Sequence, residues 1–281
     1  MTSLRRARPP AAGAKKRRSP KASTSIACIA VLLTGAAAFA DDLPPILVKA
    51  PAAGQKDATG EPVSSVYALT ALDVTTIGDV FQYTEVTVAP NGNIEESGIR
   101  LRAFEGYGIY KVPAAAPQSG YIRGSVTDVS LLLGYNFSRD DYSLDLFAGP
   151  DIQNNWLAQF DPQDATQGTQ VGVKGVAELW WTPTPQTLVF GLAEYSTAFE
   201  TYFTQVKLGY DILSGKAPGK EIFIGPEFIA LGDERFAQQR VGIHVTAIHI
   251  RSWNLEISGG YVYDNTLGSG AYSILELNTK F

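Results

Sequence analysis

The sequence predicts an all-β protein, a closed antiparallel transmembrane β-barrel of about 12 strands, with ten as the alternative. Runs with apolar residues at every second position recur from residue 64 onward, separated by clusters of Gly, Pro, Asn and Asp. Several runs are about 11 to 15 residues long, whereas strands of soluble sheets cluster near five or six and membrane-crossing strands need roughly 9 to 11. The last run, "AYSILELNTKF", alternates to its final residue, Phe281.

The first 40 residues predict a secretory signal peptide. Residues 1–25 are basic and contain no acid, and the apolar stretch "IACIAVLLTGAAAFA" follows and ends in an A-x-A cleavage site. Removing residues 1–40 takes away eight basic residues and leaves 15 Lys+Arg against 28 Asp+Glu, a net charge of −13. Nucleic acid is disfavoured as a partner because its binding needs clustered cations. We expect a protein in the outer membrane of a Gram-negative bacterium, with outer-membrane lipid as its surroundings.

The mature chain divides into a lead-in and one domain. Residues 41–63 are rich in Pro, Ala, Gly and charge and show no sustained period, which predicts a flexible periplasmic segment. Residues 64–281 are long enough for one barrel. The predicted strands are 64–74, 79–89, 97–112, 122–137, 140–150, 168–182, 186–197, 200–213, 220–231, 238–250, 253–263 and 270–281.

Each predicted strand has an apolar face and a polar face. In 122–137, Val129, Leu131 and Leu133 alternate with Asp128 and Ser130. An apolar set facing lipid and a polar set facing a lumen satisfies both surfaces of a closed sheet, and closure removes edges that lipid cannot hydrate.

The connections indicate which end of the barrel faces the cell. Turns such as "SRD", "TPTP" and "SGKAPG" alternate with a set that includes the longer "DIQNNWLAQFDPQDATQG" and "ALGDERFAQQ". With a periplasmic amino terminus, the first set falls in the periplasm and the second outside. Trp180, Trp181 and Trp253 then lie near periplasmic turns, where an aromatic belt is expected.

Candidate catalytic residues are sparse, and we expect no cofactor and no metal. The two histidines, His244 and His249, are five residues apart and are predicted on opposite faces of one strand. His244 near Glu227 with a serine is the arrangement that a lipid-modifying enzyme would need, but no G-x-S-x-G motif accompanies it.

Charged residues on the lumen side predict an internal network. Opposite charges on neighbouring strands of a narrow barrel usually neutralise one another, and the alternative is a selective passage for small solutes. The predicted lumen residues are Arg100, Arg102, Asp128, Asp145, Lys174, Glu178, Lys207, Asp211 and His244, joined by Glu227 and Arg240.

The chain resembles the BcsS family of cellulose biosynthesis proteins. The resemblance is carried by "RAFEGYGIY", "LLLGYNF", "FAGPDIQNN", "GLAEYSTAFETYFTQVKLGYD" and "IGPEFIALGDERFAQQRVGIH", over roughly residues 100 to 250. It implies a role in making, exporting or anchoring cellulose or a related exopolysaccharide, with cellulose and its export machinery as partners and no established catalytic role.

Residues at predicted external strand ends form a candidate contact for glucan or a partner protein. Aromatic faces and planar polar side chains commonly grip carbohydrate. The alternative is that these residues lock loops over the barrel and form the upper aromatic belt. The candidates are Asp151, Gln153, Asn154, Trp156, Ser196, Thr197, Phe199, Tyr202, Glu227, Asp233, Phe236 and Arg240.

Overall fold

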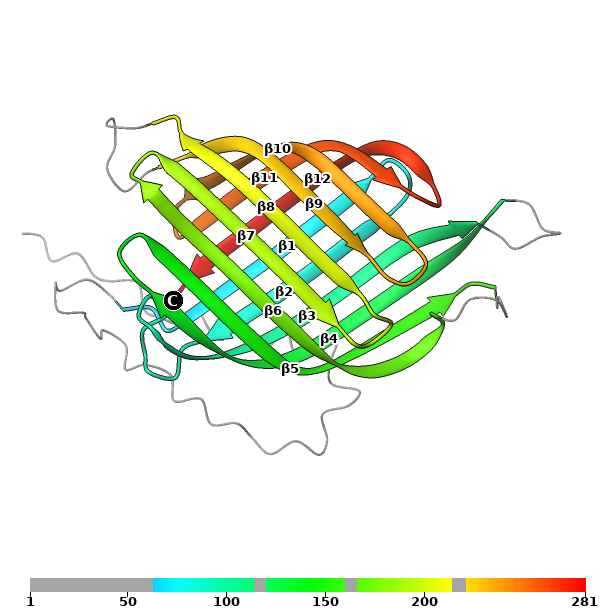
Figure 1. Cartoon of the computed structure of the whole chain (residues 1–281), viewed down its shortest axis with the longest axis horizontal. Coiled ribbons are helices and arrows are strands. Elements are labelled where there is room, and N and C mark those ends of the chain that lie inside the picture. Colours follow the sequence, from blue (N-terminus) through cyan, green and yellow to red (C-terminus); the bar gives the residue numbers. More distant parts are fainter. Residues whose placement is uncertain (1–62, 114–119, 160–165, 214–220) are drawn as a thin grey trace, which may run out of the picture. The chain divides into compact units, whose positions relative to one another are not determined.

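The computed structural model describes residues 63–113, 120–159, 166–213 and 221–281, which form a closed barrel of twelve antiparallel strands (Figure 1). Each strand pairs with its neighbours in sequence, and the first pairs with the last. Twelve strands rather than ten are therefore confirmed. The strands are β1 (Val66–Thr75), β2 (Val80–Val88), β3 (Gly98–Pro113), β4 (Tyr121–Ser138), β5 (Tyr142–Leu157), β6 (Gly168–Thr184), β7 (Thr187–Ser196), β8 (Tyr202–Asp211), β9 (Phe223–Gly232), β10 (Ala237–Ile250), β11 (Trp253–Asp264) and β12 (Gly268–Lys280).

Most strand boundaries match the sequence prediction to within a few residues, but β5 does not. It was expected to end at residue 150 and continues to Leu157, so the start of the predicted long loop belongs to the strand. The expected signal peptide, the lead-in up to residue 62 and the "SGKAPG" turn lie outside the described residues.

The carboxy-terminal run closes the barrel. β12 pairs with β1 in a continuous register that sets Leu275 opposite Leu72. The carbonyl of Phe281 accepts hydrogen bonds from the backbone N–H groups of Ser65 (3.0 Å) and Val66 (2.9 Å), and its own N–H donates to Val66 at 3.0 Å. Phe281 therefore completes the seam, which leaves neither strand with an unpaired edge there.

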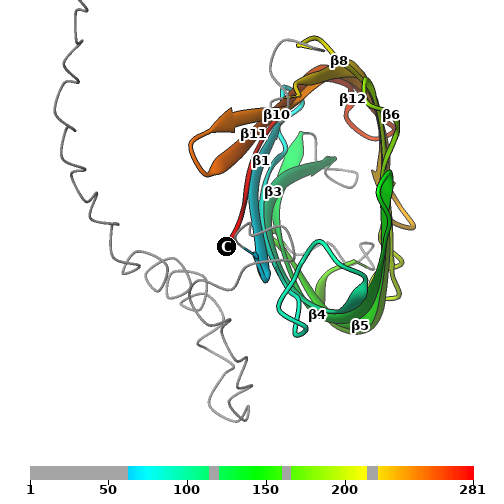
Figure 2. The same ribbon diagram turned by 90° about the vertical axis from the view of Figure 1, so that its left-hand side faces the viewer.

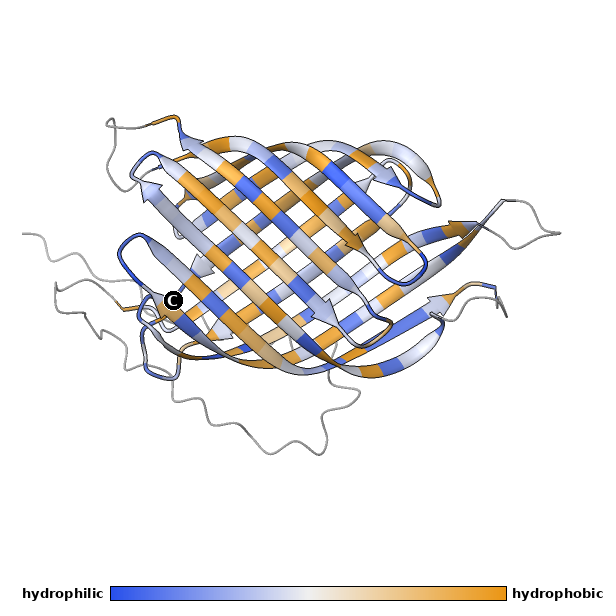
Figure 3. Ribbon diagram, viewed as in Figure 1, coloured by the Kyte–Doolittle hydropathy of each residue, from blue (hydrophilic) through white to orange (hydrophobic). Residues whose placement is uncertain are grey.

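Hydrophobic and hydrophilic residues alternate along the strands (Figure 3), and their exposure places the apolar set on the outer surface and the polar set in the interior. Leu133 and Ile243 are 60% and 61% exposed, whereas the neighbouring lumen side chains of Ser130 and His244 are buried. Such an outer face is suited to lipid. Buried apolar residues form only small internal clusters, such as Leu132, Phe147 and Val176. Among the described residues no helix has the length and apolarity to cross a membrane.

The two ends of the barrel differ in the height of the wall. We call the end where β1 begins and β12 ends the terminal end, and the opposite end the far end. β3 to β6 are 16 to 18 residues long, and β3–β4 and β5–β6 project beyond the other strands at the far end (Figure 1). The predicted contrast between short and long connections is weaker than expected, because much of the apparent far-end loop sequence is strand.

A β-bulge in β10 changes the direction of its last residues. The register with β11 shifts between Val245 and Ile248, and Ala247 has a φ of 65°. The end of the β10–β11 hairpin bends away from the wall (Figure 2). Because the bulge resets the alternation, His249 lines the same cavity as Thr246. The prediction that His244 and His249 occupy opposite faces is therefore wrong.

Candidate functional site: the barrel lumen

The lumen is one cavity of about 1130 Å³, lined by residues from all twelve strands and from connections at both ends. Its lining includes Glu95 and Asp141 at the terminal end and Asp233 and Leu267 at the far end. Fourteen Asp or Glu residues line it against nine Lys or Arg residues, a surplus of five negative charges when all are ionised. The interior is thus acidic as well as polar.

One ion-pair cluster is centred on Arg102 of β3. Its guanidinium contacts Glu85 of β2 and Glu178 of β6, both at 3.0 Å, and donates to the Thr87 hydroxyl at 3.0 Å. The same group lies 4.0 Å from the centre of the Phe147 ring. Because β3 and β6 are three strands apart, Arg102 links two walls that do not pair through their backbones.

A second cluster surrounds Lys174 of β6. Its ammonium is 2.6 Å from Asp128 of β4 and 3.3 Å from Asp151 of β5. Asp151 is fully buried and accepts hydrogen bonds from Ser196 (2.5 Å) and Gln153 (2.9 Å). Removing a partner from a buried carboxylate is strongly destabilising, because the charge is then left uncompensated.

A third cluster lies on the opposite side of the lumen. Lys207 of β8 forms an ion pair with Glu256 of β11 and lies 3.9 Å from Glu227 of β9. Glu227, fully buried, also accepts hydrogen bonds from Gln205 (2.7 Å) and the Tyr272 hydroxyl (2.8 Å).

His244 belongs to the edge of this third cluster. Its Nδ1 lies 2.9 Å from the Thr246 hydroxyl, which itself donates to Glu256 at 2.7 Å. Its Nε2 lies 3.1 Å from the carbonyl of Leu208. Both ring nitrogens are engaged, and Glu227, the partner considered from sequence, is not one of their hydrogen-bond partners.

A fourth cluster joins β10 to β1 near the far end. Arg240 contacts Asp73 at 2.6 Å, and its Nε donates to Gln238 at 2.7 Å. The Gln238 amide donates in turn to Asp79 and Asp264, at 3.1 and 3.2 Å. Asp79 lies in the β1–β2 turn, and burial raises the pKa of its carboxyl.

These four clusters act as charged crossbars, a term we use for the ion pairs of Arg102, Lys174, Lys207 and Arg240 with acids on strands two or three away in the sheet. Two crossbars lie on the β3–β6 side of the ring and two on the β8–β1 side. They brace the wall across its interior and leave the space between the two sides lined by other residues.

Three of the predicted lumen charges, Arg100, Asp211 and Asp145, are not part of the crossbars and form other hydrogen bonds. The Arg100 guanidinium donates to carbonyls of the β2–β3 connection, including Ile94 at 2.9 Å, so it fastens that loop. Asp211 accepts hydrogen bonds from the N–H groups of Leu213 and Ile222, the residues that follow β8 and precede β9. Asp145 accepts a hydrogen bond from Asn136 at 2.9 Å.

Half of the predicted mouth residues are buried, five in the strands of the barrel wall and one, Phe199, in the β7–β8 turn. Of the other six, Asn154, Trp156 and Thr197 are exposed while Tyr202, Asp233 and Phe236 are half-buried. The buried six are Asp151, Gln153, Ser196, Phe199, Glu227 and Arg240.

The buried mouth residues of β5 and β7 hold the 197–201 turn in place. The Ser196 hydroxyl accepts from the N–H of Ala198 at 3.0 Å, and Gln153 donates to Thr201 at 2.8 Å. Ala198 packs closely on Gly172: a Cβ added at Gly172 would collide with the backbone of Ala198. Phe199 and Glu200 both adopt left-handed backbone, so the turn depends on these anchors. These contacts anchor the turn to the barrel wall.

An aromatic track that was not predicted from the sequence lies inside the lumen; we define it as Phe81, Tyr83 and Phe104. The ring centres are 6.1 Å apart for Phe81 and Tyr83 and 6.0 Å apart for Tyr83 and Phe104. A Cβ at Gly106 or Gly108 would lie 2.6 Å from the Phe81 ring, so these glycines make room for it. The signal in the sequence was the inward face of "VFQYTEVTV", which carries aromatics and an acid together.

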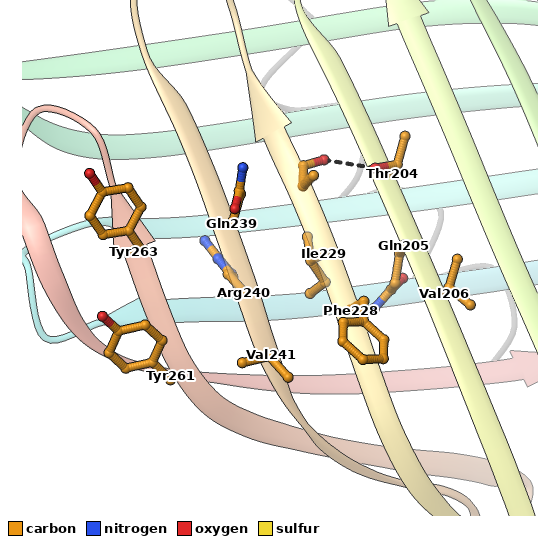
Figure 4. A pocket seen from close by; sticks show the side chains of 11 residues that line it. Thr204, Gln205, Val206, Phe228, Ile229, Gln239, Arg240, Val241, Tyr261 and Tyr263 are labelled. Atoms are coloured by element: carbon orange, nitrogen blue, oxygen red, sulfur yellow. Dashed lines mark hydrogen bonds between the residues drawn. The ribbon is translucent and has the colours of Figure 1, made fainter.

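A second hollow of about 390 Å³ lies on the outside of the barrel, over β8 to β11 (Figure 4). Phe228, Val241 and Tyr261 are exposed around it, and the Thr204 hydroxyl donates to the carbonyl of Ala230 at 3.1 Å. This groove belongs to the apolar outer surface.

In the described part of the chain, no group of three or more His, Cys, Asp or Glu side chains is arranged to hold a metal ion.

Comparisons with known proteins give a family and several distant structural likenesses. A model of the family described as cellulose biosynthesis protein BcsS matches residues 71–281. No curated protein matches the chain in sequence. Among solved structures, the β-domain of the Bordetella autotransporter BrkA is 13% identical, with a TM-score of 0.47 over 78% of this chain and all of that one. LpxR from Salmonella typhimurium is 12% identical (TM-score 0.44; 77% and 100% covered), and the KdgM porin 8% identical (0.41; 76% and 99%). Likenesses this distant carry no argument about function.

Proposed function

The chain belongs to the BcsS family of cellulose biosynthesis proteins, and from this premise we propose that it is a non-catalytic accessory barrel that serves export or surface anchoring of the polymer. The observation that carries the proposal is the family match, because residues 71–281 cover nearly the whole barrel. The family supplies the link to cellulose biosynthesis, and the step at which the barrel acts is our proposal.

The proposed location is the outer membrane, with the terminal end in the periplasm. The apolar outer face supports a lipid environment. At the terminal end, Trp181 and Trp253 are partly exposed beside the β6–β7 and β10–β11 turns, where an interfacial belt would anchor the barrel. The taller β3–β6 wall then projects outside the cell.

The proposed absence of catalysis is supported by how the polar residues are used. Both ring nitrogens of His244 are engaged, and Ser196 donates to Asp151 without a histidine partner. A hydrolytic or acyl-transfer site needs a nucleophile within reach of a base. The hydroxyl beside His244, that of Thr246, donates to Glu256 and is buried with it, so neither His244 nor Ser196 offers an exposed pair for the enzymatic alternative, a lipid-modifying reaction.

At the far end, we propose that exposed side chains meet the polymer or a protein of its export machinery. Trp156 is 59% exposed on β5, and Tyr202 and Phe236 are half-buried around the mouth. The buried residues among the predicted mouth residues support this surface, because Ser196 and Gln153 anchor the 197–201 turn through hydrogen bonds.

A small-solute channel is the second candidate function. It is favoured by the cavity, whose lining includes residues from both ends of the barrel. Conductance of the purified protein in planar bilayers tests it, and an absence of current steps would count against it.

Deletion of the gene tests the main proposal. We expect less cellulose retained at the cell surface, measured by dye binding and by glucose released from washed cells, with synthase activity in isolated membranes unchanged. Complementation with the wild-type chain should restore the surface polymer, and Trp156→Ala should restore it only partly. Unchanged amount and location of cellulose in the deletion strain would contradict the proposal.

A further inference from the structure

We propose that the lumen binds an extended, uncharged glycan strand along the aromatic track of Phe81 and Tyr83. This inference rests on the proposed function and names the ligand class and the place where it lies. It moves the main contact from the rim, where the sequence suggested it, to the interior of the barrel.

All three side chains of the aromatic track line the cavity. Phe81 and Tyr83 are half-buried residues of β2, and both line the lumen. The third ring, that of Phe104, already has a cation over it, because the Lys174 ammonium lies 4.7 Å from its centre. The rings free to stack on a ligand are therefore those of Phe81 and Tyr83. The apolar faces of pyranose rings pack well on such surfaces, as other flat groups do.

Polar groups without partners lie in the same cavity. The Tyr83 hydroxyl and the Glu194 carboxylate of β7 make no hydrogen bond or ion pair with a described residue, although both line the lumen. In the ring of twelve strands, β7 lies five positions from β2, so Glu194 belongs to a wall nearly opposite the aromatic track. Carboxylates and hydroxyls are acceptors for sugar hydroxyl groups. A glycan chain between these walls would stack on the aromatic rings on one side and donate hydrogen bonds to Glu194 on the other.

The charge of the lumen selects the class of glycan. With five more acids than bases around the cavity, an anionic polysaccharide entering it would be repelled. A neutral β-glucan pays no such electrostatic cost. The volume of the cavity also suits a glycan chain better than a single sugar. Pockets for small ligands usually span about 300 to 1000 Å³, whereas this cavity measures about 1130 Å³.

The crossbars leave room for this path. Arg102 and Lys174 bridge strands on the β3–β6 side, and Lys207 and Arg240 bridge strands on the β8–β1 side. β2 and β7 lie between these two sets in the ring, and β2 contributes Glu85 as a second partner of Arg102. The paired charges therefore flank the space in which the aromatic track and Glu194 lie.

Calorimetric titration of the purified, folded barrel with cellohexaose tests the inference. Phe81→Ala and Tyr83→Ala are each expected to weaken binding about tenfold. Tyr107→Ala is the matched control, because Tyr107 lies between Gly106 and Gly108 but is 51% exposed on the outer face. It should bind within about twofold of wild type. Migration in unheated detergent gels verifies that each variant is folded. If Tyr83→Ala does not fold, Tyr83→Phe takes its place, and it should keep most of the wild-type affinity because it keeps the ring.

The ligand class is tested with hexagalacturonate, an acidic strand of equal length, for which we expect at least about tenfold weaker binding than for cellohexaose. Tighter binding of the acidic strand, no binding of either, or equal losses in Tyr83→Ala and Tyr107→Ala would overturn the inference. If cellohexaose binds through Tyr83 while gene deletion leaves cellulose unchanged, the proposed function fails and the inference stands. If deletion removes surface cellulose while Tyr83→Ala binds like wild type, only the inference fails.

Discussion

Replacing Asp151 with Ala is expected to destabilise the barrel and release the 197–201 turn. The substitution removes a fully buried carboxylate that accepts from Ser196 at 2.5 Å and Gln153 at 2.9 Å. Lys174 keeps Asp128 at 2.6 Å, so the ammonium is not left unpaired. The loss is therefore that of two hydrogen bonds to a charged acceptor, and we expect a decrease of about 3 kcal/mol in the free energy of unfolding.

Urea unfolding of the barrel in lipid vesicles, followed by tryptophan fluorescence, measures this change. Asp151→Asn keeps an acceptor for Ser196 and should lose roughly half as much. Asn154→Ala is the control, because Asn154 is exposed on the outer face of the same strand and its bond to Thr169 is exposed too; we expect a change within about 0.5 kcal/mol. An Asp151→Ala barrel as stable as the Asn154→Ala barrel would refute the view that the buried network holds the far end.

The remaining predictions concern packing, the lipid face and the seam. Gly172→Ala should displace the 197–201 turn and speed amide hydrogen exchange at Ala198, whereas Gly175→Ala, with open space around it, should not; equal exchange in the two variants would count against the packing. Ile243→Arg should cost about 2 to 4 kcal/mol of unfolding free energy in vesicles if its level is near the bilayer centre, and no loss would place that face in water. Deleting Phe281 removes three backbone hydrogen bonds at the seam and should lower the yield of folded barrel in vesicles, measured by gel migration; a wild-type yield would show that they are dispensable.

Sequence reasoning predicted the strands and their faces because a period of two is a local property. Val129, Leu131 and Leu133 reveal the lipid face of β4 without knowledge of any other strand. The same reasoning ended β5 too early. Asp151 and Gln153 resemble loop residues in isolation, although they alternate with the outward Ile152 and form the inner face of a strand.

The site depends on contacts that no local pattern encodes. Arg102 meets Glu178 three strands away, and Lys207 meets Glu256 at a similar separation, so closure of the sheet decides these partners. The face of His249 was mispredicted because the bulge at Ala247 adds a residue to the alternation, and neither Gly nor Pro marks it. The most specific family segments supply many of the buried partners, which explains residue combinations that barrel formation alone does not require.

The proposed function depends on the orientation of this sheet, with its apolar side toward lipid and its polar side around the lumen. Spin labels at single cysteines test it directly, with the one native cysteine, Cys28, replaced. In vesicles, labels at Leu133 and Ile243 should collide mainly with oxygen, and a label at Glu194 mainly with a water-soluble nickel complex. Equal access of the nickel complex to labels on both faces, or the reverse pattern, would contradict this orientation of the sheet.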